Sequence, residues 1–360
     1  MVINVSTVKS WDACERAAFY THHARLSRGP SRALAIGTAF HNAIATGLAN
    51  GWPAACRHVL AHAAAEIDPT LDIGEEYKSA AYVEETLAMV RAYQEAYEPI
   101  ADLWTVVHPE VSFLVPVPNS EHNCIWHHWR DRRTGNDIWT PPSEWDILGG
   151  HVEPAHPEPD PSCTCWQPHR LAGKTDALVL NDNNLWLFEH KTTSYLSHVW
   201  WQQWVLDKQP TAYIWGVWRA LGIRPVGVML NAVRKPTEDQ VGAWNSKRRS
   251  GDPRTVKDYI TFERRPFLRS EEDLLRFERQ LKRTLNTWEA AISDPDGIEA
   301  FPMRNVGGNC TQYNRVCPNH ALCCQHGDMH RDTLLSFPRR QELTYVEEHQ
   351  LDVINKALAH

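Results

Sequence analysis

The stretch GKTDALVLNDNNLWLFEHK, residues 173–191, constrains the fold most, because its pattern predicts a β-hairpin. Two apolar, β-prone runs, Asp176–Leu180 and Leu185–Glu189, flank the polar residues 181–184, which have turn chemistry. If those four residues form the loop, Leu180 pairs with Leu185 and Asp176 falls directly opposite Glu189. Opposed residues point to the same face, with Cβ atoms about 4.5–5.5 Å apart.

Lys191 lies two residues beyond Glu189 and therefore shares its face. Two adjacent carboxylates repel each other, and a hard divalent cation such as Mg²⁺ or Mn²⁺ removes that repulsion. A lysine beside a metal-bound water can orient the water or stabilise charge on a phosphate. This is the minimal set for metal-assisted phosphodiester hydrolysis. A surface hairpin with a charged edge gives the same pattern, so the rest of the chain must decide.

Length and charge limit the function classes without choosing one. At 360 residues and 42% hydrophobic content, the chain can hold one large domain or two ordinary ones, with a sizeable core. The net charge of −7 argues against a surface that is basic throughout. Residues 234–283 nevertheless hold 14 Lys and Arg against nine Asp and Glu. This basic segment, with its run Lys247–Arg249 and with Arg264, Arg265 and Arg269, is either a DNA-binding surface or a solvated face.

The cysteines indicate metal binding. Their number, nine, is odd, and the polar N-terminus lacks a signal peptide, which argues against a secreted disulfide scaffold. No run approaches 18 apolar residues, so we expect no membrane span and a cytoplasmic location. Cys310, Cys317, Cys323 and Cys324 fall within fifteen residues. Three ligands there need a fourth, and Cys14 is the available candidate.

The remaining patterns predict mainly helices. A helix within residues 4–20 has Ser6 as its N-cap and contains Cys14. Further helices are expected at 31–50, 52–67, 75–97, 271–292 and 342–358, and strands at 104–117 and 226–233. Gln209 and Tyr213 lie four apart on another helix.

Residues 116–170 are rich in Pro, His and Trp and predict an irregular insertion between two core strands. A zinc ion held by Cys124, Cys163, Cys165 and His169 is one possibility, and a proline-rich surface excursion is the other.

Together these patterns resemble the RecB-like branch of the PD-(D/E)XK nuclease superfamily. They are most similar to members with an iron–sulfur cluster, such as AddB and the CRISPR-adaptation nucleases. The matching residues occur in the family's order: Cys14, Gly37 and His41, Gly173 and Asp176, Glu189 and Lys191, Gln209 and Tyr213, then the C-terminal cysteines.

The resemblance implies an α/β fold with a restriction-endonuclease-like core, a mixed central sheet flanked by helices, and a C-terminal cysteine-cluster region. It implies that His41, Asp176, Glu189 and the backbone carbonyl of His190 bind Mg²⁺ or Mn²⁺. Lys191 would be the catalytic lysine, and Gln209 and Tyr213 would position the DNA strand and the surroundings of the lysine. Cys14, Cys310, Cys317 and Cys323 would hold a 4Fe–4S cluster, with zinc as the alternative metal. Cys324 adjoins Cys323, so the identity of the last ligand stays open, as does a supporting role for Glu110.

The implied organisation is a nuclease domain over residues 1–330, including the insertion, and a helical tail over 331–360. The implied activity is metal-dependent DNA cleavage, as an exonuclease on single strands or duplex ends in recombination, repair or phage DNA metabolism. Recombination or replication proteins would be its partners. The alternatives are a nuclease-like protein that binds DNA without cleaving it, and a structure- or site-specific endonuclease.

Overall fold

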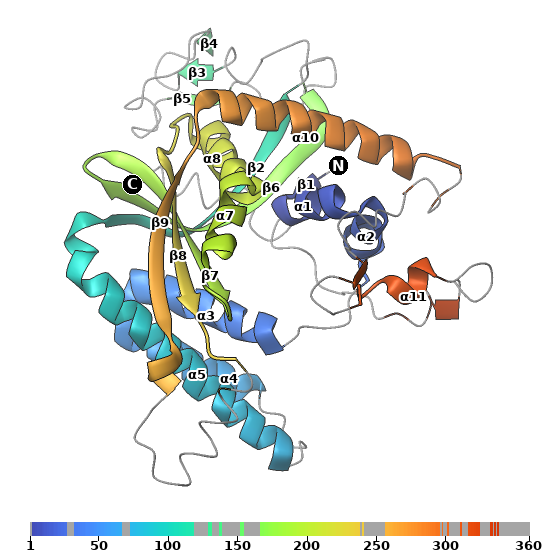
Figure 1. Cartoon of the computed structure of the whole chain (residues 1–360). Helices are drawn as coiled ribbons and strands as arrows, with labels where there is room; N and C mark the ends of the chain where they lie inside the picture. Colours follow the sequence, from blue (N-terminus) through green and yellow to red (C-terminus); the bar gives the residue numbers. More distant parts are fainter. Residues whose placement is uncertain are drawn as a thin grey trace, which may run out of the picture.

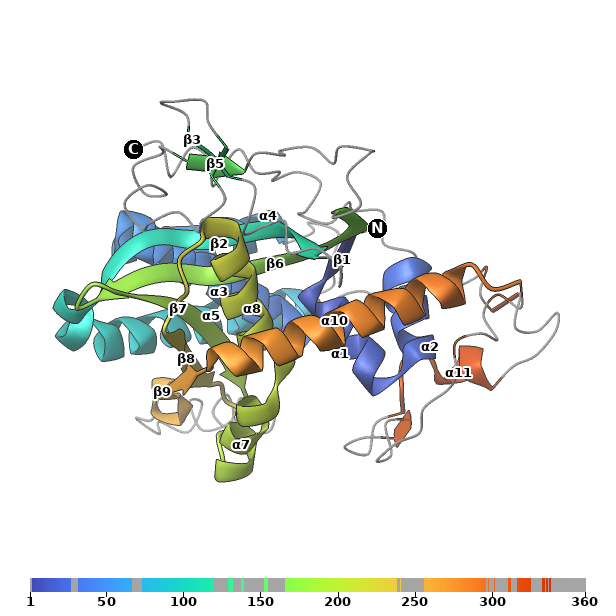
Figure 2. The ribbon, with the colours of Figure 1, turned by 90° about the horizontal axis from the view of Figure 1, so that it is seen from above.

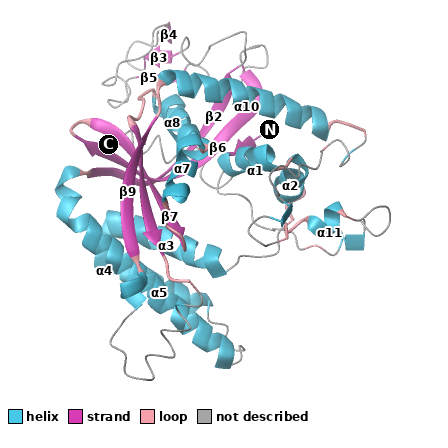
Figure 3. Cartoon of the chain, in the orientation of Figure 1, coloured by secondary structure: helices cyan, strands magenta, loops and turns pink. Residues whose placement is uncertain are grey.

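The computed structural model describes most of the chain up to residue 324 and a few positions beyond it. The described residues are 2–26, 32–66, 73–118, 129–131, 137–138, 152–154, 166–237, 240, 256–295, 297, 301, 310–311, 316–324, 332–333, 335 and 337. Helices pack around one large sheet in this part of the chain (Figures 1 and 3).

The core is a mixed sheet of six strands in the order β1-β6-β7-β8-β9, with β2 paired to the other edge of β6. The strands are β1 (Val2–Asn4), β2 (Thr105–Pro118), β6 (Trp166–Asn181), β7 (Asn184–Thr193), β8 (Gly227–Arg234) and β9 (Thr261–Leu268). The β1–β6 and β7–β8 pairs are parallel, and the other pairs are antiparallel. The mixed central sheet expected from the sequence is confirmed.

Helices cover both faces of this sheet (Figure 1). One face carries α3 (Arg32–Asn50), α4 (Trp52–Glu66) and α5 (Ile73–Tyr97), and the other carries α1 (Val5–Ala13), α8 (Lys208–Leu221) and α10 (Glu271–Ile292). Strand residues alternate between the two cores: Phe188 packs with the first group of helices, whereas Leu187 packs with the second. Seen from above, α10 runs across its face, and α7 (His198–Leu206) projects beside the sheet (Figure 2).

The hairpin forms with the register that the sequence predicts, but its loop is shorter. Leu180 pairs with Leu185, and the ladder then continues to Asn181 paired with Asn184. Only Asp182 and Asn183 remain in the turn, with φ of 48° and 62°. Two successive residues with positive φ are typical of the tight turns whose twist matches the flanking strands, and Asn and Asp tolerate that conformation well.

The N-terminal segment differs from the predicted single helix. Asn4, not Ser6, is the N-cap of α1, because its Oδ1 accepts hydrogen bonds from Thr7 N at 2.7 Å and from Ser6 Oγ at 2.6 Å. The helix ends at Cys14, which is extended with φ −163° and ψ 115°. A short α2 (Glu15–Ala18) and a π-helix, η1 (Phe19–His23), follow. The prediction that Cys14 lies within a helix was therefore wrong.

The core strands extend into both ends of the segment predicted to be an irregular insertion. β2 continues to Pro118, and β6 begins at Trp166, so His169 lies on a core strand. Between them, β3 (Trp129–Asp131), β4 (Asp137–Ile138) and β5 (Val152–Pro154) form a small separate sheet. The proposed zinc ligands Cys124, Cys163 and Cys165 lie outside the described residues, as do the Lys247–Arg249 run and the helix predicted at 342–358.

The other predicted elements agree closely with the structure. The long helix predicted at 271–292 is α10. Three short elements complete the described chain: the 3-10 helices η2 (Glu98–Leu103) and η4 (Val256–Tyr259), and α11 (His320–Cys323). Among the described residues, no helix is both long and apolar enough to cross a membrane.

Candidate active site

The candidate site lies at a gap along one edge of β6, between the segment that pairs with β1 and the segment that pairs with β7. β1 pairs with β6 as far as Ala172, and β7 pairs with the same edge of β6 only from Ala177 onward. Asp176 is therefore the last residue before the β6–β7 ladder begins. The last pair of that ladder is Ala177 with Phe188, so Asp176 and Glu189 lie one step beyond it, and their direct opposition stays a prediction. The split in the ladder leaves the backbone there open to side chains from other elements.

Asp176 is held by two histidines. Its Oδ2 accepts a hydrogen bond from the His190 backbone N–H at 2.6 Å, and its Oδ1 lies 3.0 Å from His41 Nδ1. His41 comes from α3, on the opposite side of the site from the strands. Burial alone would raise the pKa of Asp176, but the His41 and His190 rings hold that pKa well below its ordinary value. The pKa of His41 is raised, because Asp176 outweighs the lowering effect of burial.

Glu189 is buried, with 3% of its surface exposed. Its Oε1 accepts hydrogen bonds from Lys191 Nζ at 2.5 Å and from Gln209 Nε2 at 3.0 Å. Its Oε2 has no hydrogen-bond partner among the described residues. Burial raises the pKa of Glu189 to about 7, Lys191 opposes that rise, and Asp176 adds to it. Glu189 is thus a buried acceptor with one oxygen available.

Lys191 lies between the carboxylates and an indole ring. Its Nζ pairs with Glu189 and lies 5.4 Å from the centroid of the Trp204 ring on α7. Burial lowers the pKa of Lys191, but Glu189 and Asp176 outweigh it, so the pKa is raised and the amine stays an ammonium. A fixed positive charge beside a ring face and a carboxylate is well placed to stabilise negative charge on a substrate.

Gln209 connects the carboxylates to α8. Its Nε2 donates to Tyr213 Oη at 2.8 Å as well as to Glu189, so the predicted four-residue spacing does place both side chains on one helix face. The helix begins at this point because Asp207 is its N-cap, with Oδ1 accepting from the Gln209 backbone N–H at 2.7 Å. The N-cap therefore fixes where α8 begins. This places Gln209, in the first turn of the helix, where it contacts Glu189.

The His190 ring lies between Asp176 and Tyr93 of α5. Its Nε2 lies 2.8 Å from Tyr93 Oη on α5, and its Nδ1 lies 3.3 Å from Asp176 Oδ2. Burial lowers the pKa of His190, which favours the neutral ring. The ring thereby anchors the strand between Glu189 and Lys191, while its backbone stays at the site.

Two residues near the site had no signal in the sequence. Lys9 on α1 lies 2.8 Å from Asp207 Oδ2 and 3.5 Å from Gln209 Oε1. Tyr93 reaches His190 from a helix almost a hundred residues earlier in the chain. Only Asp207 was recognisable, since an Asp followed by Lys-Gln-Pro is a typical helix start. The carboxylate of Glu110 pairs with Lys174, and the β2–β6 register sets Glu110 level with Asp176, so its supporting role stays a prediction.

The donor set suits a hard divalent cation. Two carboxylates and a backbone carbonyl are oxygen ligands of the kind that Mg²⁺ and Mn²⁺ prefer. The buried Oε2 of Glu189 without a partner, and the raised pKa of that carboxyl, both indicate a place for positive charge. Within the described residues, however, no group of three or more His, Cys, Asp or Glu is arranged to hold a metal ion. Lys191 and His41 occupy one oxygen of each carboxylate instead.

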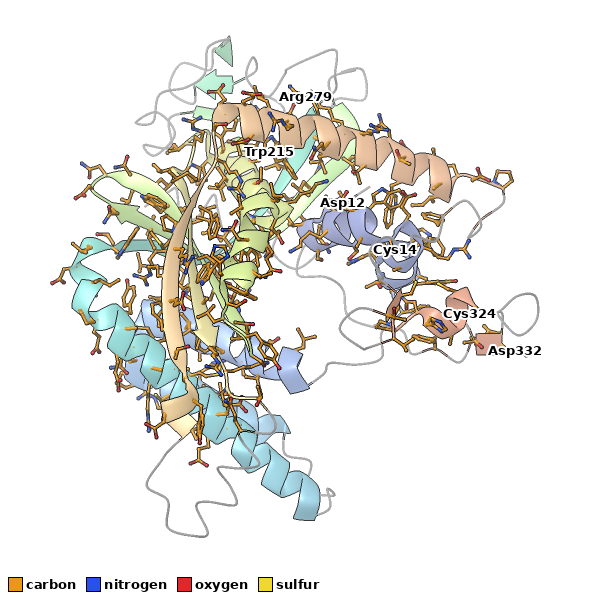
Figure 4. All side chains as sticks on the ribbon, viewed as in Figure 1. Asp12, Cys14, Trp215, Arg279, Cys324 and Asp332 are labelled. Atoms are coloured by element: carbon orange, nitrogen blue, oxygen red, sulfur yellow. The ribbon has the colours of Figure 1, made fainter. Side chains whose placement is uncertain are left out.

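Cys14 caps the C-terminal end of α1 and lies near the cysteines of residues 310–324. Cys14 and Cys324 are labelled in Figure 4, where α11 lies beside α2. Burial raises the pKa of the Cys310 thiol, and Cys317, Cys14 and Cys324 raise it further. Burial likewise raises the pKa of Cys323 to about 11. A backbone hydrogen bond of 2.8 Å, from Cys317 N to Cys310 O, closes the loop between those two cysteines. All six described cysteines are free, and none belongs to a preformed metal group.

The described part of the predicted zinc site contains only His169. Its ring is buried, and its Nε2 lies 3.1 Å from Glu289 Oε2 on α10. The imidazole therefore joins β6 to α10.

The chain belongs to the PD-(D/E)XK nuclease superfamily, whose family model matches residues 2–324. That range includes the whole sheet, the candidate site and the cysteines from Cys14 to Cys324. Members of this superfamily generally use Mg²⁺ or Mn²⁺. The mixed sheet flanked by helices is consistent with its restriction-endonuclease-like fold.

Comparison with individual proteins adds little. A search of the curated proteins gives no match. A crystal structure from Eubacterium rectale, described as a "Putative exonuclease", aligns over 97% of this chain and 93% of its own chain. The sequence identity is 10% and the TM-score is 0.42. A likeness at that level carries no information about the function of this chain.

Proposed function

We propose that this protein is a metal-dependent deoxyribonuclease, and that it acts as an exonuclease on single strands or duplex ends. The observation that carries the proposal is the convergence of Asp176, Glu189 and Lys191 where the β6–β7 ladder opens, with one buried Glu189 oxygen lacking a partner. Asp176, Glu189, His41 and the His190 carbonyl would hold the cation. When bound, it would supply an activated water and shield the phosphate charge.

The protein's own groups have separate roles in this proposal. The ammonium of Lys191 orients the attacking water and stabilises charge on the phosphate. Gln209 and Tyr213 hold the Glu189 carboxylate from the α8 side and guide the strand past Lys191. His190 and Tyr93 keep the strand backbone in place from the opposite face.

We further place the chain in the RecB-like branch, with an iron–sulfur cluster held by Cys14, Cys310, Cys317 and either Cys323 or Cys324. The support is that these thiols, distant in sequence, lie close enough to alter one another's pKa values. Four thiolates suit an iron–sulfur cluster or a zinc ion. Free thiols and this cofactor both suit the reducing cytoplasm.

The test is cleavage of end-labelled single-stranded, linear duplex and closed circular DNA by the purified protein with Mg²⁺ or Mn²⁺. We expect metal-dependent loss of label from the linear substrates and intact circles. Cleaved circles would indicate an endonuclease instead. Binding without any cleavage, with either metal, would contradict the assigned activity.

A further inference from the structure

We propose that Lys9 is a positioning residue of the active site, whose ammonium group fixes the orientation of the Gln209 side-chain amide. The inference deepens the proposed nuclease function and rests on it for its catalytic consequence. The orientation of the Gln209 side-chain amide can be tested whether or not the protein cleaves DNA.

The contacts form a chain from α1 to the carboxylates. Lys9 Nζ lies 3.5 Å from Gln209 Oε1, and Gln209 Nε2 lies 3.0 Å from Glu189 Oε1. Asp207 holds Lys9 in place, with 2.8 Å between Nζ and Oδ2. Lys9 is only partly exposed. Its Nζ lies 5.5 Å from the centroid of the Trp204 ring, and Lys191 Nζ lies 5.4 Å from the same centroid.

The two ends of the amide have different partners, and each partner permits one orientation. An ammonium group only donates hydrogen bonds, and Glu189 Oε1, which already accepts from the Lys191 ammonium, acts as an acceptor. The carbonyl oxygen of Gln209 must therefore face Lys9, and the amino group must face Glu189. Rotating the amide by 180° would set donor against donor at Lys9 and acceptor against acceptor at Glu189. Tyr213 does not choose, because its hydroxyl can donate or accept.

Lys9 acts from the side of the amide away from Glu189. In the proposed function, a cation or substrate engages the oxygens of Glu189. The hydrogen bond to Glu189 alone would therefore not hold the Gln209 amide in one orientation. Among the described hydrogen bonds and ion pairs, Lys9 and Asp207 contact each other and Gln209, not that oxygen pair. They keep the amide oriented while the carboxylate changes partners.

The chain contains a matched control for this contact. Asp12 and Lys208 form a second ion pair between α1 and α8, with 2.6 Å between Oδ2 and Nζ. Figure 4 labels Asp12 on α1. The pair joins the same two helices and has similar exposure, but no contact of Asp12 with Gln209 occurs among the described hydrogen bonds and ion pairs. Removing it should loosen the helix contact without changing the amide.

The kinetic experiment measures single-turnover cleavage of end-labelled DNA with saturating Mn²⁺. We expect Lys9→Met to slow cleavage about tenfold, the effect of losing one hydrogen bond to a charged group. Lys9→Arg should keep most of the rate, and Lys9→Glu should be slower than Lys9→Met, because it offers the amide a second acceptor. Asp12→Asn should stay within about twofold of the wild type. In a Gln209→Ala background, Lys9→Met should have no further effect. An equal slowing there would overturn the positioning role.

The second experiment needs no cleavage. In protein labelled with heavy nitrogen at glutamine, the Gln209 side-chain amide signal is assigned by its loss in Gln209→Ala. We expect Lys9→Met to move that signal and Asp12→Asn to leave it in place. An unmoved signal in Lys9→Met would overturn the inference, even if the protein cleaves DNA. A wild type that never cleaves would contradict the proposed function, and the amide signal would still decide on Lys9. If Lys9→Met does not fold, Lys9→Gln takes its place in both experiments.

Discussion

At the residue scale, the two carboxyl groups of the site have pKa values shifted in opposite directions, lowered at Asp176 and raised at Glu189. Asp176 has the rings of His41 and His190 beside it, which keep its pKa well below the ordinary range. Glu189 is more deeply buried, and its pKa of about 7 reflects that burial together with the Asp176 charge. The pair therefore carries less than its full negative charge near neutral pH when no cation is present. The negative charge that would attract a cation therefore lies mainly on Asp176.

The first prediction concerns Lys191. Lys191→Ala should reduce the cleavage rate by about 10²–10³-fold, the usual effect of removing one preorganised charge from a reaction centre. DNA binding should change little, because one amine and no proposed metal ligand is removed. Initial rates and binding of the same labelled DNA measure both effects.

Lys174→Ala is the matched control, because Lys174 is a lysine on the neighbouring strand whose partner among the described ion pairs is Glu110, not Asp176 or Glu189. It should cleave at the wild-type rate. A Lys191→Ala protein as fast as this control would show that the role of Lys191 is wrongly assigned.

Local patterns predicted part of this site. Strand alternation and a symmetric turn place Asp176, Glu189 and Lys191 together, and helix spacing pairs Gln209 with Tyr213. The place of His41 came only from the resemblance. Lys9 and Tyr93 could not be found, because their contacts depend on how α1 and α5 pack on the sheet, and no sequence period encodes that packing.

At the element scale, the α8 helix packs unusually close to β2. Gly216 of α8 and Gly173 of β6 both contact the Phe113 ring, and a Cβ at either position would overlap it. The ring fills the space that two side chains would otherwise take. The closeness of α8 to the sheet therefore depends on three residues from three elements.

The second prediction follows from this packing. Gly216→Ala should lower the free energy of unfolding by about 1–3 kcal/mol, because overpacking forces the ring or the helix to move. Gly37→Ala is the control, since its added Cβ would lie at an ordinary 3.4 Å from Thr192 Oγ1. That change should be neutral or stabilise by up to about 1 kcal/mol. Denaturant unfolding of both variants measures the difference, and Phe113→Leu should partly restore Gly216→Ala.

The third prediction concerns the buried ion pair between α8 and α10. Glu278 binds Arg219, and it also accepts from Trp215 Nε1 at 3.1 Å and pairs with Lys282 Nζ at 3.1 Å. Burial would raise the pKa of Glu278, but Arg219 and Lys282 outweigh it, so the pKa is lowered. A lowered pKa stabilises the fold above the ordinary value of 4.5, and this contribution disappears as the pH falls through the folded-state pKa.

Glu278→Gln should therefore destabilise the protein at pH 7, by about 3 kcal/mol for breaking a buried pair. The difference from the wild type should shrink as the pH falls below 4.5, the ordinary value for this carboxyl. Glu272→Gln breaks an exposed pair with Arg276 on the same helix, and it should cost at most about 1 kcal/mol. A gap between Glu278→Gln and the wild type that stays constant down to pH 3 would contradict this account.

Elements with strong periodicity were predictable, and those shaped by distant contacts were not. The α10 helix agrees with its predicted range because its apolar face and its Ser270 capping box are both local signals. The helix predicted across Cys14 is interrupted instead. Trp11 packs on Trp288 with 4.8 Å between ring centroids, and Arg16 Nε donates to Phe301 O at 2.8 Å. These contacts with the far end of the chain accompany the change in direction at Cys14.

At the scale of the whole molecule, the cysteine region connects the two ends of the described chain. Cys14 is the N-cap of α2, and the other proposed cluster ligands lie beyond residue 309. A metal held there closes a loop of almost the whole chain, and the cost of loop closure rises only slowly with length.

The fourth prediction is that anaerobically purified protein is brown and contains about four irons and four sulfides per chain. Cys14→Ser should lose the colour and lower the melting temperature of the whole protein. Cys56→Ser, a partly buried cysteine of α4 in a different core, should keep the colour. Colourless protein with stoichiometric zinc would exclude iron but keep the connection between the ends. Metal-free protein of full stability would exclude both.

The long-range contacts of α1 and α2 also limit the order in which the molecule can be assembled. A ribosome delivers Lys9 and Arg16 first, but their partners follow 198 and 285 residues later. At about 5–20 residues per second, the N-terminal segment waits roughly 15–60 s for Phe301. The hairpin and α8 can form in that interval, together with the contacts of Lys9 to Asp207 and Gln209, whereas the Arg16 contact of α2 cannot. Newly made chains can therefore assemble the α1 side of the site before α2 meets its partner at Phe301.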